Sequence, residues 1–199
     1  MFDVRIHGRN GAEVAGTAEL LAAAAAAMGR AAEVLAEPDL GAGPGRTSAA
    51  VAHCLVNNGP PDGLAEGTPS QPQVDGLIVQ DRELLPRAEV LGGICPETYV
   101  LVNSVLGFGD LGLSDDVQGQ CRDRLVILPA AGLRVVQQDG SLLTAMMAGG
   151  FAALAGIVSL ASVVWAIEDR QGPVADGCAA AARAAYEFVR IEKEAMVAA

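Results

Sequence analysis

The sequence has few basic residues: its 199 residues include 13 Lys and Arg against 24 Asp and Glu, a net charge of −11. Without clustered basic side chains, nothing offsets the repulsion of nucleic-acid phosphates, so the charge argues against a nucleic-acid partner. Aromatic residues are also scarce, at 4 %, although 51 % of the residues are hydrophobic. The core of one ordinary domain must therefore be built from Ala, Val, Leu and Ile.

Cysteine and histidine are sparse and lack the spacing of a metal site. The four cysteines form no C-x-x-C pair, and the two histidines do not complete a ligand set: Cys54, Cys95, Cys121, Cys178, His7 and His53. Zinc and iron–sulfur sites draw their ligands from tight local spacings, so we predict no metal site. Scattered thiols suit a reducing compartment, and the N-terminus lacks the pattern of a signal peptide. We therefore expect a cytoplasmic protein.

Charge is absent from one long stretch, LLTAMMAGGFAALAGIVSLASVVWAI at residues 142–167. Its length is sufficient to span a bilayer, but its flanks are acidic where a membrane anchor carries Lys or Arg. Gly156 followed by Ser159 is typical of a helix end and a new helix N-cap. We predict two short helices, broken near residues 156–159, that pack at a core or an interface, and no membrane association.

Most of the other apolar runs are short and bounded by turn-forming residues, which predicts strands at residues 4–8, 49–57, 76–81, 98–104 and 124–130. The alanine-rich segment from about Thr17 to Glu37 is expected to form one helix, and the pattern after residue 140 is helical. Proline and glycine predict loops at 37–48 and 59–73. Continuous apolar runs suit parallel strands. The predicted fold class is α/β: one Rossmann-like domain, residues 1–199, with an open, mostly parallel sheet flanked by helices.

The opening segment, VRIHGRNGAEV at residues 4–14, has the strand–turn–helix order with which many α/β proteins bind phosphate. It fails the dinucleotide fingerprint G-x-G-x-x-G, which would need glycines at positions 10 and 13. Asn10 can form the same turn, but Glu13 would repel a pyrophosphate at the start of the helix. Residues 11–17 approach a Walker A loop without its lysine. We therefore predict no dinucleotide at this loop.

The other candidates for catalysis stand alone in the sequence. His7 ends a predicted strand, where α/β proteins place active sites, but a single histidine there is also a common structural residue. Asp115 and Asp116 follow Ser114, which is typical of a helix N-cap. Arg46 could clamp an anion or remain solvated. No Ser–His–Asp group can be assembled, so we predict no complete active site in this chain.

Several segments occur together in a characteristic order: MFDVRIHGRNGAEVAGTAELLAAAA at the start, GPGR at 43–46, LIVQDRELL at 77–85, YVLVNS at 99–104, and GGFAALAGIVSLASVVWAI followed by AAAARAAYEFV. In this order they resemble the gamma subunit of the 2-oxoacid:acceptor oxidoreductases, the family that contains pyruvate:ferredoxin oxidoreductase. That family begins V-R-x-x-G-R-G-G-Q-G before an alanine-rich helix. The resemblance covers nearly the whole chain.

The departures from the family pattern lie in the loops. Asn10 and Glu13 replace two loop glycines, Ala12 replaces a glutamine, and Thr47 and Ser48 replace the two glycines after the second loop arginine. The resemblance implies that the loop residues face coenzyme A (CoA) or a subunit interface. These candidate site residues are Gly8, Arg9, Asn10, Gly11 and Arg46.

The resemblance also implies a function. The complex would oxidatively decarboxylate a 2-oxoacid with CoA, giving acyl-CoA, CO2 and a reduced acceptor. Alpha, beta and ferredoxin-like delta subunits would hold thiamine diphosphate, Mg and the iron–sulfur clusters, and would pass electrons to ferredoxin or NAD(P). This chain would carry no cofactor, and would contribute structure and border the CoA site. Two alternatives stay open: a stand-alone Rossmann-like module that binds a small molecule, and a degenerate homologue with a purely structural role.

Overall fold

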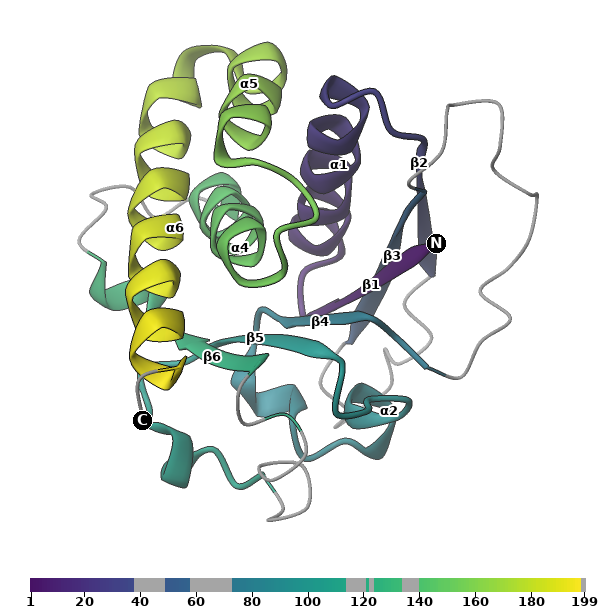
Figure 1. Cartoon of the computed structure of the whole chain (residues 1–199), viewed down its shortest axis with the longest axis vertical. Coiled ribbons are helices and arrows are strands. Elements are labelled where there is room, and N and C mark those ends of the chain that lie inside the picture. The colour runs from purple at the N-terminus through teal and green to yellow at the C-terminus, as the bar shows by residue number, and fades with distance from the viewer. Residues whose placement is uncertain (38–48, 58–72, 114–120, 122–123, 134–139, 198–199) are drawn as a thin grey trace.

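The computed structural model describes residues 1–37, 49–57, 73–113, 121, 124–133 and 140–197, which form an α/β fold around one sheet (Figure 1). The six strands of the described ranges lie in the order β2-β3-β1-β4-β5-β6. Their bounds are β1 Phe2–Gly8, β2 Ala32–Glu37, β3 Ala50–Val56, β4 Gly76–Val79, β5 Tyr99–Asn103 and β6 Leu125–Leu128. β1, β4, β5 and β6 pair in parallel, whereas β3 is antiparallel to both β1 and β2. The predicted open, mostly parallel sheet is confirmed.

The long helices lie on one face of the sheet: α1 (Gly11–Ala27), α4 (Gly140–Ala155) and α6 (Ala175–Val197). α5 (Leu160–Arg170) packs on these helices and away from the sheet, and the short α2 (Ala88–Leu91) lies on the opposite side (Figure 1). Mainly small and branched side chains fill the core between α1, α4, α6 and the sheet, and Phe151 is its largest fully buried member. A second, smaller core lies around Leu77, Val79 and Val102.

The predicted helix from Thr17 to Glu37 is wrong in its second half. α1 ends at Ala27, Gly29 adopts a φ of 74°, and residues 32–37 form the edge strand β2. A positive φ suits glycine and stops a right-handed helix. The segment after it pairs with β3 over its whole length, from Ala32 opposite Val56 to Glu37 opposite Val51. Tertiary pairing therefore overrides the helix preference of Ala and Glu at this point.

The predicted break in the long apolar stretch is confirmed. α4 ends at Ala155, and Gly156 has a φ of 70°. Ser159 then caps α5: its side chain accepts a hydrogen bond from Ser162 N, and the Ser162 side chain accepts one from Ser159 N in return. Among the described residues, no helix combines the length and the apolar character that crossing a membrane requires.

Candidate functional site

The loop between β1 and α1 is built around two residues that the sequence singled out. Asn10 is the N-cap of α1, and its side chain accepts a hydrogen bond from Ala12 N at 3.0 Å. A Cβ atom on Gly8 would lie 2.7 Å from both Gln80 Oε1 and Val14 Cγ2, so a larger residue would displace these side chains where β1, β4 and α1 approach one another. The structure therefore brings Gly8, Arg9, Asn10 and Gly11 together at the carboxyl end of β1.

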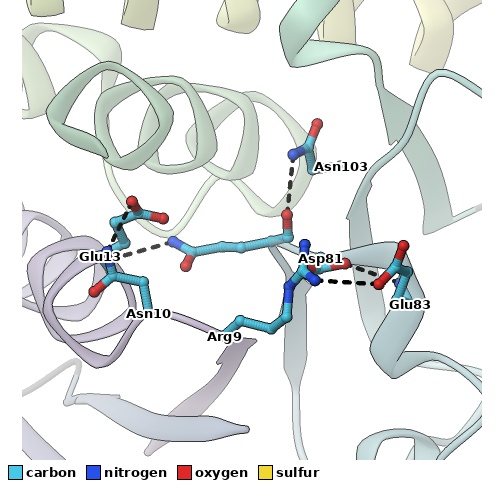
Figure 2. A network of polar contacts seen from close by, with 7 residues as sticks. Arg9, Asn10, Glu13, Asp81, Glu83 and Asn103 are labelled. Carbon is cyan, nitrogen blue, oxygen red and sulfur yellow. Dashed lines mark hydrogen bonds and ion pairs between the residues drawn. The ribbon is translucent and has the colours of Figure 1, made fainter. Parts of the chain in front are cut away.

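Arg9 connects the ends of two neighbouring strands. Its guanidinium forms ion pairs with Asp81 and, at 3.2 Å, with Glu83, both of which follow β4 (Figure 2). Asp81 in turn caps the short turn Arg82–Leu84 by accepting a hydrogen bond from Glu83 N. The Arg9 side chain nevertheless remains 51 % exposed. The charge of the guanidinium is thus paired with carboxylates of the same chain, while part of the side chain stays open to solvent.

The carboxyl ends of the next strands continue the same site. Asn103, the last residue of β5, donates a hydrogen bond from Nδ2 to the Gln80 backbone carbonyl at 2.9 Å, and its Oδ1 accepts one from Ala130 N. A hollow of about 270 Å³ lies between these strand ends. It is lined by Arg9, Gln80, Asp81, Arg82, Glu83, Asn103, Ser104, Val105 and Ala131. Open α/β sheets bind ligands at this edge.

Glu13 places a carboxylate in the first turn of α1. Its carboxylate accepts a hydrogen bond from Asn10 Nδ2 at 3.0 Å (Figure 2) and packs against Gly140, where a Cβ atom would overlap it. Gly11 begins α1 and Gly140 begins α4, so the carboxylate lies beside the positive ends of two helices. The chain thus supplies its own anion at this position.

Gln80 ties this region to the helices. Its Nε2 donates hydrogen bonds to Thr17 Oγ1 at 2.6 Å and to the Glu13 carbonyl at 3.2 Å. The Thr144 hydroxyl, on α4, donates to the same carbonyl at 3.4 Å. The first turns of α1 and α4 are therefore fixed to the end of β4 by side chains that are buried.

Sequence reasoning did not select Gln80, Asp81 or Asn103. The signal was present, because all three are polar residues at or just past the end of an apolar run, in GLIVQD and YVLVNS. The carboxyl ends of parallel strands meet at one edge of a sheet, which is where such side chains collect. Arg46, Asp115 and Asp116 lie outside the described residues.

His7 is buried in the sheet, with only 3 % of its surface exposed. Burial, together with the neighbouring charges of Arg5 and His53, lowers its pKa from 6.5 to about 3. Its Nε2 has no hydrogen-bond partner in the described part of the chain. The imidazole is therefore neutral at physiological pH, which fits the structural role that was one of the two interpretations of His7.

The buried imidazole makes stability depend on pH. In the unfolded chain His7 binds a proton near pH 6.5, whereas the folded chain resists protonation down to about pH 3. The free energy of unfolding is therefore at its full value above pH 6.5 and falls as the pH drops below that value. The loss due to His7 is about 1.4 kcal/mol at pH 5.5. Urea unfolding at pH 8 and pH 5.5 measures this loss. His7→Gln is the control, because it removes the titrating group and should show a correspondingly smaller loss. Equal losses in both proteins would contradict the assignment.

Comparison with known proteins identifies what this arrangement is similar to. The family described as pyruvate ferredoxin/flavodoxin oxidoreductase matches residues 3–188. The chain is 28 % identical over 194 residues to the pyruvate synthase subunit PorC of Methanothermobacter marburgensis, covering 96 % of this chain and 98 % of that one.

Solved structures with the same fold include two of similar length. The pyruvate oxidoreductase subunit PORC of Thermotoga maritima has a TM-score of 0.70 at 22 % identity, covering 94 % of this chain and 95 % of its own. The gamma subunit of a keto/oxoacid ferredoxin oxidoreductase of Geobacter sulfurreducens has a TM-score of 0.66 at 17 % identity, covering 95 % and 98 %.

A third structure places the fold inside a longer chain. The 2-oxoglutarate:ferredoxin oxidoreductase of Magnetococcus marinus, solved with 2-oxoglutarate, coenzyme A and succinyl-CoA bound, matches with a TM-score of 0.63 at 13 % identity. The match covers 98 % of this chain but 31 % of that one. With the family match extending over residues 3–188, the resemblance seen in the loops and the tail is confirmed, and the chain belongs to the pyruvate ferredoxin/flavodoxin oxidoreductase family.

Proposed function

We propose that the chain is the gamma-type subunit of a complex that oxidatively decarboxylates a 2-oxoacid with CoA to acyl-CoA, CO2 and a reduced acceptor. The observation that carries this proposal is the family match over residues 3–188. The similarity to PorC along almost the full length of both chains supports the same role. The gamma-type chain contributes a folded domain to the complex and no complete active site of its own.

The cofactors are assigned to the partner chains. Within residues 1–37, 49–57, 73–113, 121, 124–133 and 140–197, no three His, Cys, Asp or Glu side chains are grouped as metal ligands. As the family membership implies, thiamine diphosphate, Mg and the iron–sulfur clusters are proposed to belong to alpha, beta and ferredoxin-like delta subunits. These subunits also pass the electrons to ferredoxin or NAD(P). The location proposed for the whole complex is the cytoplasm.

The strand-end hollow is proposed as the surface that meets a partner subunit beside the CoA site. Arg9 is half-exposed at its rim, and an exposed guanidinium can pair bidentately with a carboxylate or a phosphate. Asp81 and Glu83 already give the rim negative charge, and Glu13 adds another carboxylate nearby. This charge favours a contact with a partner protein over direct binding of CoA phosphates at Gly8, Arg9, Asn10 and Gly11.

Co-purification separates this proposal from its alternatives. A tagged chain expressed with its neighbouring genes should isolate larger, iron-containing polypeptides and CoA-dependent 2-oxoacid oxidation. A stand-alone binding module would be isolated by itself. A degenerate structural homologue would bind the partners, but the activity of the complex would be indifferent to substitutions in the loop between β1 and α1.

Arg9→Ala is expected to weaken assembly of the complex about tenfold, which corresponds to about 1.4 kcal/mol, with a smaller effect on the apparent KM for CoA. Interferometry measures the dissociation of the complex, and steady-state kinetics measure the apparent KM for CoA. Arg170→Ala is a matched control. Arg170, the last residue of α5, is also a half-exposed arginine, and it forms an ion pair with Glu19. If Arg9→Ala behaves like Arg170→Ala, the loop is only a turn.

A further inference from the structure

Two of the four cysteines, separated by 26 positions, meet in the fold. The Cys121 thiol donates a hydrogen bond to the Cys95 carbonyl at 3.3 Å. Cys95 lies in the turn before β5, where its backbone N–H donates to Thr98 Oγ1 at 2.9 Å and its Sγ lies 3.4 Å from the same oxygen. Thr98 is fixed in turn, because its hydroxyl donates to the Val74 carbonyl. The turn therefore holds Cys95 beside the side chain of Cys121.

The two thiols differ in their access to solvent. Cys95 is partly exposed, whereas Cys121 is fully buried in the smaller core with Val100 and Leu125. Burial raises the pKa of the Cys121 thiol, and the neighbouring Cys95 raises it further, while Arg124 opposes both. An oxidant in solution therefore reaches Cys95 first, and Cys121 stays buried as a protonated thiol.

We propose that Cys95 and Cys121 are a redox-responsive pair that a peroxide converts into a disulfide. The Cys95 thiolate attacks one oxygen of hydrogen peroxide, the O–O bond breaks, and the departing hydroxide takes a proton to become water. This leaves a sulfenic acid on Cys95. The Cys121 sulfur then attacks the Cys95 sulfur, and the hydroxyl leaves as a second water with the proton of the Cys121 thiol. Two thiols and one peroxide give one disulfide and two waters.

The contact between the two cysteines favours this bond. A disulfide needs Cα atoms within about 7 Å of one another, and the hydrogen bond from the Cys121 thiol to the Cys95 carbonyl brings the Cys121 sulfur against the backbone of Cys95. Closing the bond requires the Cys95 sulfur to turn from Thr98 Oγ1 toward Cys121. The bond would enclose β5 together with Asn103 and Ser104, which line the strand-end hollow.

Mass spectrometry of the folded full chain tests the pair directly. Trypsin releases residues 88–122 as one peptide that contains both cysteines and no other, because Lys and Arg are absent between Arg87 and Arg122. After equimolar peroxide, this peptide should lose the mass of two hydrogens and regain it with dithiothreitol. Additional cleavage after Glu97 should leave the two fragments joined only by the disulfide.

Variants and denaturant decide the interpretation. Cys54→Ser, at a buried thiol whose pKa burial raises to about 12, should form the link at the wild-type rate. Cys121→Ser should stop at a Cys95 sulfenic acid that dimedone traps, and Cys95→Ser should form no link. The folded chain should form the link at least tenfold faster than the chain in urea. An unlinked wild-type peptide, an absence of trapped sulfenic acid in Cys121→Ser, or equal rates with and without urea would overturn the proposal.

Discussion

Phe151→Ala is expected to lower the free energy of unfolding by about 3–5 kcal/mol. Phe151 is fully buried on α4, in a core otherwise built mainly from small and branched side chains. Its ring lies over Gly76 of β4, where an added Cβ atom would overlap it. Removing the ring leaves a cavity between α4 and the sheet, and Gly76 has no side chain that could fill it. Urea or thermal unfolding followed by far-UV circular dichroism measures the loss.

Trp165→Ala is the control for this substitution. Trp165 lies on the neighbouring helix α5 and is 51 % exposed, so its removal should cost about 0.5–1 kcal/mol. A loss below about 1 kcal/mol for Phe151→Ala would show that the core between α4 and the sheet relaxes to fill the space, which would contradict the packing described above.

Gly149→Ala is expected to lower the free energy of unfolding by about 2 kcal/mol. A Cβ atom on Gly149 would lie 2.8 Å from Ala182 Cα, in the backbone of α6, so the two helices would have to separate. Overpacking costs about 1–3 kcal/mol, at the upper end when the neighbour is backbone, and alanine returns about 1 kcal/mol through its helix propensity. The same unfolding measurements apply.

Gly16→Ala makes the identical substitution on α1 with the opposite expected sign. The nearest atom to a Cβ on Gly16 is Thr144 Cγ2 at 3.4 Å, which is an ordinary contact. Helix propensity then dominates, and the variant should gain up to about 1 kcal/mol. Destabilisation of both variants by the same amount would mean that glycine flexibility, and not the contact between α4 and α6, explains the effect at Gly149.

The parallel part of the sheet was predictable because its strands are buried on both faces. Runs such as GLIV and YVLVN are continuous, short and bounded by turn residues, and the structure places them at β4 and β5. The segment 32–37 was not predictable in the same way. Its sequence, AEVLAE, is made of good helix formers, and only pairing with β3, 13 or more residues further along the chain, makes it a strand.

The candidate site was predictable in its loop and not in its partners. The glycines and Asn10 indicated a turn after β1, and the structure begins α1 at Gly11 with Asn10 as its N-cap. Asp81 and Glu83 pair with Arg9 across more than 70 positions. Such a contact depends on strand order, and the order β1-β4 cannot be read from local sequence.

The close approach at Gly149 also has a mechanical consequence. α4 begins against Glu13 at the strand-end site, and its Gly149 packs directly against the backbone of α6. Gly156 and Gly172, with φ of 70° and 51°, lie at the joints on either side of α5. α4 therefore packs against Glu13 at its first turn and against the backbone of α6 at its middle, so one helix supports both the strand-end site and the position of α6.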